Sequence, residues 1–305
     1  MEAKSEIYSQ GYRKWEGERK QQTPPWFLIG EAGLANLFES SGKKTKFFFF
    51  SLFLFYYLGC FGITVLRLQA DNLRSVPAIA PFVEAFAGLN LDYPEIWWHA
   101  YMLANPTAAF AFIAMIIYGA QLISKDKAAN ALQIYFSKAV TRFDYILGKF
   151  FAIGLIMALA TLVPSAIMLV TGLVVTPDFM KYISQAWYVP FIITAFWLLY
   201  TVTYGSVILA FSASQTSSTR TSVLFFGFLM VVELVPLLIS KLMGASDFIT
   251  ALSWSDSIKG IADALLAQEA ADGGLLFWQS VMVTAYTVAA MVFLSRRIEP
   301  VAVVS

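Results

Sequence analysis

Long apolar stretches alternate with shorter polar ones along most of the chain. Six of the apolar stretches are about 20 residues long, and they cover approximately 47–66, 103–123, 150–172, 188–211, 221–240 and 275–294. About 20 helical residues cross the roughly 30 Å hydrocarbon core of a bilayer. Backbone groups within lipid must bond to one another, and the sequence lacks the ten-residue alternating strands of an outer-membrane barrel. The pattern therefore predicts an all-α integral membrane protein with six transmembrane helices.

Composition agrees with this prediction. The chain of 305 residues is 58% hydrophobic and only 13% charged, whereas soluble globular domains are about 25% charged. It contains one cysteine, Cys60, and one histidine, His99. A disulfide framework or a Cys/His metal site within one chain is therefore not expected, and Cys60 reads as a small packing residue.

The distribution of basic residues predicts the orientation. An even number of spans places both ends of the chain on one side, and 16 of the 21 Lys and Arg residues fall on that side. The positive-inside rule then makes both termini cytoplasmic and the protein a multi-pass protein of the cytoplasmic (inner) membrane. We expect flexible cytoplasmic tails at 1–24 and 298–305, on either side of a transmembrane domain at 47–297.

Residues 25–46 predict an interfacial helix ahead of the first span. Aromatic and apolar residues recur there at roughly helical spacing, namely Trp26, Phe27, Leu34, Leu37 and Phe38. Lys43, Lys44 and Lys46 follow at the level expected for lipid headgroups. An amphipathic helix with basic residues at one end is typical of a segment lying on the bilayer surface.

The loop at 241–274, on the outer side in this orientation, predicts a second amphipathic helix before the last span. Trp254, Ile258, Ile261 and Leu265 are spaced by four, three and four residues. Ser253 followed by Asp256 gives a helix-start signal.

The cytoplasmic loop at 124–149 is too polar to span and too regular for a linker. Leu132, Tyr135 and Phe136 form an apolar stripe at helical spacing, with Ala139 continuing it and Lys138 on a neighbouring face. Thr141 with Asp144 three residues on predicts the start of a second helix that becomes the third span. Such an exposed helix suits docking to a protein, but it suits adsorption to anionic lipid equally well.

The same segment resembles the first cytoplasmic loop of ABC-2 type transporter permeases. Those loops have an acidic residue, a leucine-rich stretch, Ser, a basic residue, Pro-Val-Ser-Arg, an aromatic residue and Leu-Gly-Lys. The matching positions here are Asp126, Leu132, Ser137, Lys138, Val140, Thr141, Arg142, Tyr145, Leu147, Gly148 and Lys149. Ala139 stands where the family usually has proline, and Asn130 and Ala131 stand where it often has Gly-Thr.

The resemblance implies a coupling helix that sits in a cleft of a separate ATP-binding cassette ATPase subunit. Two permease copies, identical or closely homologous, would form the membrane unit of an exporter. The residues expected to couple to the ATPase are Asp126, Leu132, Tyr135, Phe136, Lys138, Thr141, Arg142 and Tyr145. On this basis, charge reversal at Arg142, or alanine at Tyr135 and Phe136, is expected to uncouple ATP hydrolysis from transport.

The chain itself is not expected to be an enzyme. It has no G-x-x-x-x-G-K-[ST] phosphate loop. ATP and Mg would therefore be bound by the partner subunit, with no cofactor, metal or catalytic residue in this chain. The expected partners are the ATPase subunit, the second permease copy and the lipid bilayer, with no nucleic acid.

Glu233 is the clear acidic residue inside a predicted span. A charge near the bilayer centre costs about 3 kcal/mol on insertion scales, so this carboxyl should face the protein interior, be protonated or pair with a polar group. It could lie on the transport pathway or dimer interface, or it could be a structural acid bonded to a neighbouring helix. Glu233→Gln would separate these readings, because only the first predicts altered transport at unchanged abundance.

Alternative functions remain open from sequence alone. An ion-gradient-driven secondary transporter would want several intramembrane carboxylates or matched broken helices, and the sequence offers one acid and no internal repeat. A membrane enzyme lacks a cluster of His, Asp, Glu or Cys from which to build a site. A non-transporting factor with the same fold is also compatible with the sequence.

Overall fold

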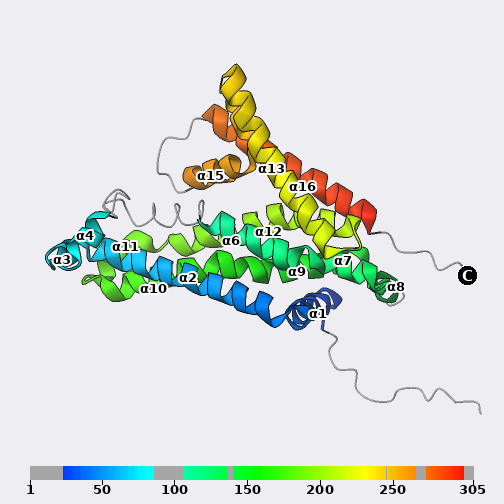
Figure 1. Cartoon of the computed structure of the whole chain (residues 1–305), viewed down its shortest axis with the longest axis horizontal. Coiled ribbons are helices and arrows are strands. Elements are labelled where there is room, and N and C mark those ends of the chain that lie inside the picture. The colour runs from blue at the N-terminus through cyan, green and yellow to red at the C-terminus, as the bar shows by residue number, and fades with distance from the viewer. Residues whose placement is uncertain (1–22, 86–105, 137–139, 245, 266–272, 299–305) are drawn as a thin grey trace, which may run out of the picture.

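The computed structural model describes residues 23–85, 106–136, 140–244, 246–265 and 273–298. All regular elements within these ranges are helices (Figure 1). Six segments are long and apolar enough to cross a membrane, namely Lys43–Leu68, Ala109–Ala128, Arg142–Val175, Val189–Ser214, Ser218–Met243 and Gly273–Arg297. The predicted all-helical fold with six candidate spans is confirmed. His99, Lys138 and most of both predicted tails lie outside the described residues.

Shorter helices lie between several of the spans. Ahead of the second span are α1 (Pro25–Ser40), α2 (Lys43–Leu68), α3 (Ala70–Arg74) and α4 (Ala80–Ala85). The second span comprises α6 (Pro106–Ala114), the π-helix η2 (Met115–Gly119) and α7 (Gln121–Ala128), and α8 (Ala131–Phe136) follows it. The third span comprises α9 (Arg142–Ala160) and α10 (Leu162–Val175), followed by α11 (Phe179–Ala186). The remaining helices are α12 (Val189–Ser214), α13 (Ser218–Met243), α14 (Asp247–Ala251), α15 (Trp254–Leu265) and α16 (Gly273–Arg297).

Helix α12 is the centre of the bundle. In an apolar stretch of 18 residues, 61% of the residues of α12 are buried, compared with 22% for α13 and 11% for α16. The second and third spans and α16 all pack against α12, and in Figure 1 α13 and α16 run obliquely to the second and third spans. Because α13 and α16 leave most of their apolar side chains exposed, their outer faces suit a hydrocarbon environment.

A π-helical turn interrupts the second span, and a side chain from α12 satisfies the backbone there. The hydroxyl of Ser212 accepts hydrogen bonds from the amides of Ile123 and Ser124 at 3.0 and 2.9 Å. It also donates to the carbonyl of Ala120 at 2.9 Å. Backbone groups that leave the helical pattern inside a membrane need such a partner, so Ser212 fixes this irregular turn against α12.

The third span breaks at Thr161, between α9 and α10. Pro164 lies three residues later and has no amide proton to give to the carbonyl of Ala160, four residues before it. The amide and the hydroxyl of Thr161 both donate to the carbonyl of Met157, at 3.0 and 2.9 Å. The third span is therefore divided into two helices beside Pro164.

Helix α1 accounts for most of the segment predicted to be interfacial. It packs along the first turns of α9, and Ile29, Gly33 and Leu37, spaced by four residues, form its buried edge. The helix ends at Ser40, so Lys43, Lys44 and Lys46 start α2 and do not belong to α1. Its predicted position on a lipid surface remains a prediction.

Helix α15 has the amphipathic character predicted for the loop before the last span. The hydroxyl of Ser253 accepts from the amide of Asp256 at 3.2 Å, as expected at a helix start. Trp254 and Ile258 are buried. The Trp254 ring packs against Tyr204, Phe228 and Tyr286 at centroid distances of 5.4, 6.1 and 5.6 Å. This contact joins α15 to three spans.

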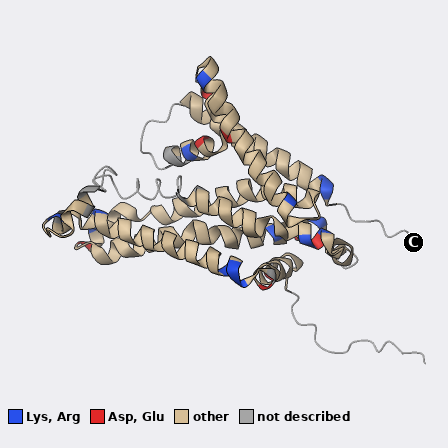
Figure 2. Cartoon of the chain, in the orientation of Figure 1, with Lys and Arg blue, Asp and Glu red and all other residues tan. Residues whose placement is uncertain are grey.

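Basic residues gather at one end of the bundle, which we call the basic end. It comprises the start of α2, the α7–α9 loop, the start of α13 and the end of α16 (Figure 2). Helices α3, α4 and α11 lie at the opposite end (Figure 1).

Candidate functional site at the basic end

The candidate site is the segment 124–149, which runs from α7 through α8 into the start of α9 and which we call the α7–α9 loop. Helix α7 stops at Ala128, and Asn130 then adopts a positive φ of 54°. Asn tolerates this left-handed conformation better than most residues, and the turn directs α8 away from the axis of α7. Glycine, which suits such a turn better still, is common near this position in the resembling loops.

Helix α9 starts as the sequence predicted. The amide of Asp144 donates to the hydroxyl of Thr141, and the amide of Thr141 donates to the carboxylate of Asp144, both at 3.1 Å. This reciprocal capping box satisfies two amides at the exposed helix end. It also starts the third span at Arg142, eight residues earlier than the apolar run indicated.

A buried ion pair joins the two ends of the loop. The Nζ of Lys149 lies 2.7 Å from the Oδ2 of Asp126, and the side chain of Lys149 is only 2% exposed. The hydroxyl of Tyr145 donates to the same carboxylate oxygen at 2.7 Å. The Lys149 ammonium also lies 5.2 Å from the centre of the Tyr145 ring. A buried charge needs such compensation, so these three residues fix α7 to α9.

The predicted apolar stripe faces inward. Tyr135 and Phe136 pack against the buried Tyr145 ring at centroid distances of 5.5 and 5.9 Å, and Leu132 is half-buried against the core. Burial, with the nearby charge of Asp126 adding to it, raises the pKa of Tyr135. Tyr135 is thus a half-buried packing residue of the loop.

Among the described residues of the loop, the large apolar side chains that are exposed belong to Ile134 and Phe143, and we call this pair the outer surface of the loop. Their exposed fractions are 61% and 71%. Neither residue belongs to the stripe or the motif that the sequence indicated. The signal was available for Ile134, which lies two residues from Leu132 and Phe136 and therefore falls on the opposite face of the helix. Both faces are apolar, so periodicity alone did not show which one is buried.

Two cations of the loop bind the ends of other spans. Arg142 Nη1 donates to the carbonyl of Ser295, near the end of α16, at 3.1 Å. Lys127 Nζ donates to the carbonyl of Ala213, at the end of α12, at 2.6 Å. Positive charges are favourable at the carbonyl ends of helices. The loop is therefore attached to four spans, because it is continuous with the second and third and bonded to the fourth and sixth.

Glu233, the other predicted site residue, lies far from this loop along α13. Its carboxylate accepts hydrogen bonds from the Ser253 hydroxyl at 2.9 Å and from the amide and hydroxyl of Ser255 at 2.8 and 2.7 Å. These donors lie at the start of α15, where a helix dipole favours an anion. Glu233 therefore has the polar partners that its place in an apolar span predicts, although the sequence did not indicate that serines of α15 would provide them.

In a comparison with known protein families, residues 19–296 match the family described as "ABC-2 family transporter protein". The chain belongs to the ABC-2 transporter family. It is a multi-pass membrane component of such a transporter, a class of subunit that typically has no catalytic activity and works with an ATPase partner. A search of curated proteins found no match. In the described ranges, no three His, Cys, Asp or Glu residues come together as a possible metal site.

Proposed function

We propose that this chain is the permease subunit of an ABC-2 exporter and that the α7–α9 loop couples it to a separate ATP-binding subunit. The observation that carries the proposal is the two-sided loop. Its inner side is fixed by the Asp126–Lys149 ion pair, and its outer side presents Ile134 and Phe143. Exposed apolar residues on a short rigid element suit docking in a cleft of a partner.

The attachments of the loop explain how a movement of the partner could reach the membrane domain. A displacement of α8 acts on α7 and α9 through the covalent chain and the buried ion pair. It acts on α16 through Arg142 and on α12 through Lys127. A rigid linkage of this kind transmits displacement, because packed elements move as units and do not deform continuously.

Orientation and assembly form part of the same proposal. The basic end would face the cytoplasm, where an ATP-binding subunit can reach α8. Two permease copies, identical or closely homologous, would flank the substrate pathway, and two ATP-binding subunits would drive them. ATP and Mg would be bound by those subunits.

Docking can be tested by copurification of the ATP-binding subunit from the native cells in mild detergent. We expect the double variant Ile134→Ala, Phe143→Ala to lower the amount of bound ATPase at least tenfold, because removal of two apolar anchors weakens a small interface strongly. The matched control is Phe179→Ala, Met180→Ala in α11, which removes two exposed apolar side chains at the opposite end. That control should leave binding unchanged.

Two results would contradict the proposal. Equal ATPase binding by both double variants would assign Ile134 and Phe143 to a lipid surface. A chain that purifies with no ATPase at all, even after cross-linking, would favour the ion-gradient-driven alternative and direct attention to Glu233.

A further inference from the structure

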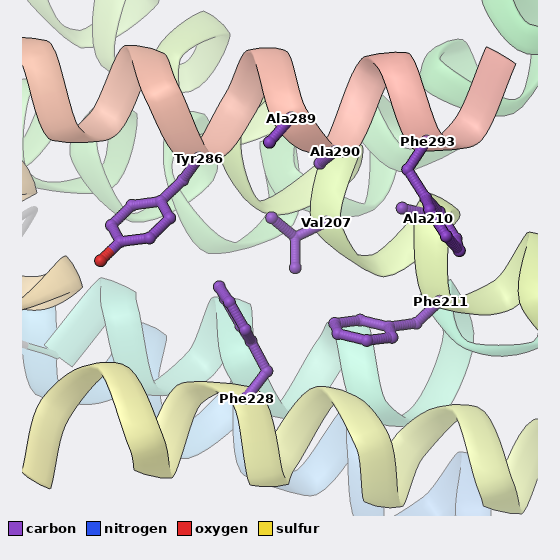
Figure 3. A pocket seen from close by; sticks show the side chains of 8 residues that line it. All are labelled: Val207, Ala210, Phe211, Phe228, Tyr286, Ala289, Ala290 and Phe293. Atoms are coloured by element: carbon purple, nitrogen blue, oxygen red, sulfur yellow. The ribbon is translucent and has the colours of Figure 1, made fainter. Parts of the chain in front are cut away.

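A cavity of about 250 Å³ lies between α12, α13 and α16, near the basic end. Figure 3 shows the rings of Phe211, Phe228 and Tyr286 around it, with Ala289 and Ala290 on the facing stretch of α16. The alanines leave room that larger side chains would fill. Neither the transport proposal nor the hydrogen-bond network of the loop uses this space.

The lining of the cavity is apolar. Among the side chains that line the cavity, only Tyr286 has a polar group, and its hydroxyl donates to the carbonyl of Leu252 at 3.1 Å. The ring therefore offers only its hydrocarbon part to the cavity. A polar ligand would lose its bonds to water without gaining any from these walls, so the cavity selects an apolar occupant.

The volume limits the size of that occupant. A dry apolar cavity of about 150 Å³ holds a benzene molecule, whereas pockets for drug-sized ligands measure about 300–1,000 Å³. At about 250 Å³, this cavity falls between the two. A segment of one hydrocarbon chain fits these limits. Ala289 and Phe293 are exposed, so the hydrocarbon chain of a ligand can enter the cavity from the surrounding membrane.

A positive charge lies at the end of the cavity nearest the basic end. The guanidinium of Arg297 lies 5.2 Å from the centre of the Phe293 ring, and Phe293 lines the cavity. Within the described part of the chain Arg297 has no acidic partner. The charge of Arg297 acts on Lys127, and Arg142 bonds to Ser295 two residues before it, so like charges converge here. An anionic group would relieve their repulsion.

We propose that this cavity binds one hydrocarbon chain of an anionic amphiphile whose headgroup pairs with Arg297. Cation and cavity are joined by Phe293, which touches both. Arg297 is at the end of its helix, where a long basic side chain reaches the headgroup level of a bilayer. The site goes beyond the coupling proposal and is independent of it, since binding requires no ATPase.

The test uses the full-length chain in phosphatidylcholine vesicles with two photoactivatable probes. One is a fatty acid with a diazirine in its chain, and the other is phosphatidylglycerol carrying the same chain. We expect labelled peptides to contain Phe228 or Phe293, and Ala289→Phe to lower labelling at least fivefold by filling the cavity. The control Ala285→Phe adds the same ring to an exposed position of α16 that does not line the cavity.

The headgroup requirement is tested separately. We expect Arg297→Gln to remove the preference for phosphatidylglycerol over a phosphatidylcholine probe with the same chain, and the adjacent exposed Arg296→Gln to preserve it. Labelling by only one of the two anionic probes would support the site and identify the source as a free fatty acid or a lipid. Equal labelling of the Ala289→Phe and Ala285→Phe variants, or equal effects of the two arginine changes, would overturn the proposal.

Discussion

Lys149 is the residue whose environment departs furthest from its usual one. Its side chain is 2% exposed, although lysine is rarely buried unless it is paired. It lies beneath α1, since a Cβ atom added at Gly33 would come within 3.9 Å of its Nζ. Its compensation comes from the Asp126 carboxylate and the Tyr145 ring. The pair is therefore a fixed point between the second and third spans.

Removing one member of this pair should be worse than removing both. Breaking a buried ion pair typically costs about 3–5 kcal/mol, whereas replacing both charges is often nearly neutral. We expect Asp126→Asn to lower the thermal stability of the detergent-solubilised chain markedly, because it leaves the Lys149 charge uncompensated. The double variant Asp126→Asn, Lys149→Met should recover much of that loss. Effects of the two single changes that merely add would show that the pair is not coupled.

At the scale of elements, α1 and α9 cross where both carry a glycine. A Cβ atom at Gly148 would come within 2.6 Å of the Trp26 carbonyl oxygen and 2.9 Å of the Ile29 Cβ. A Cβ atom at Gly30 would come within 2.9 Å of the Gly148 carbonyl oxygen. The absence of side chains at this crossing lets the two backbones approach closely, as small residues do between membrane helices. This close approach of the two backbones places α1 over Lys149.

Gly148→Ala should therefore separate α1 from α9. Overpacking of this kind typically costs about 1–3 kcal/mol, and here the obstacle includes backbone that cannot rotate away. We expect a lower unfolding temperature and faster proteolysis of α1 in detergent. The control is Gly62→Ala in α2, where an added Cβ meets no atom within 4 Å. If both variants behave alike, the close crossing does not stabilise the fold.

At the scale of the whole molecule, the basic end and the opposite end differ in charge (Figure 2). This asymmetry predicts the orientation through the positive-inside rule. In a Cys60→Ser background, we expect Arg74→Cys at the end of α3 to react with a membrane-impermeant maleimide on intact cells. Lys44→Cys at the start of α2 should react only after permeabilisation.

This labelling also has a clear contrary result. Reaction of Lys44→Cys on intact cells, with Arg74→Cys protected, would reverse the orientation. The α7–α9 loop would then lie outside the cell, and docking to an ATP-binding subunit would be impossible.

Sequence determined the helical class and the six candidate spans, because both depend on local properties. A run of about 20 apolar residues has few stable alternatives to a helix in a bilayer. Cap signals are equally local, which is why Thr141 and Asp144 predicted the start of α9 correctly.

Only the tertiary structure decided which face of each helix is buried. Leu132, Tyr135 and Phe136 formed a clear stripe, but Ile134 on the opposite face is also apolar, so periodicity could not tell packing from docking. In the folded protein, Tyr135 and Phe136 pack against the ring of Tyr145, and this contact decides which face of α8 turns inward. The partners of Lys149, Arg142 and Glu233 likewise come from segments separate in the chain. Such contacts depend on how helices pack, and hydrophobicity along one helix does not specify its neighbours.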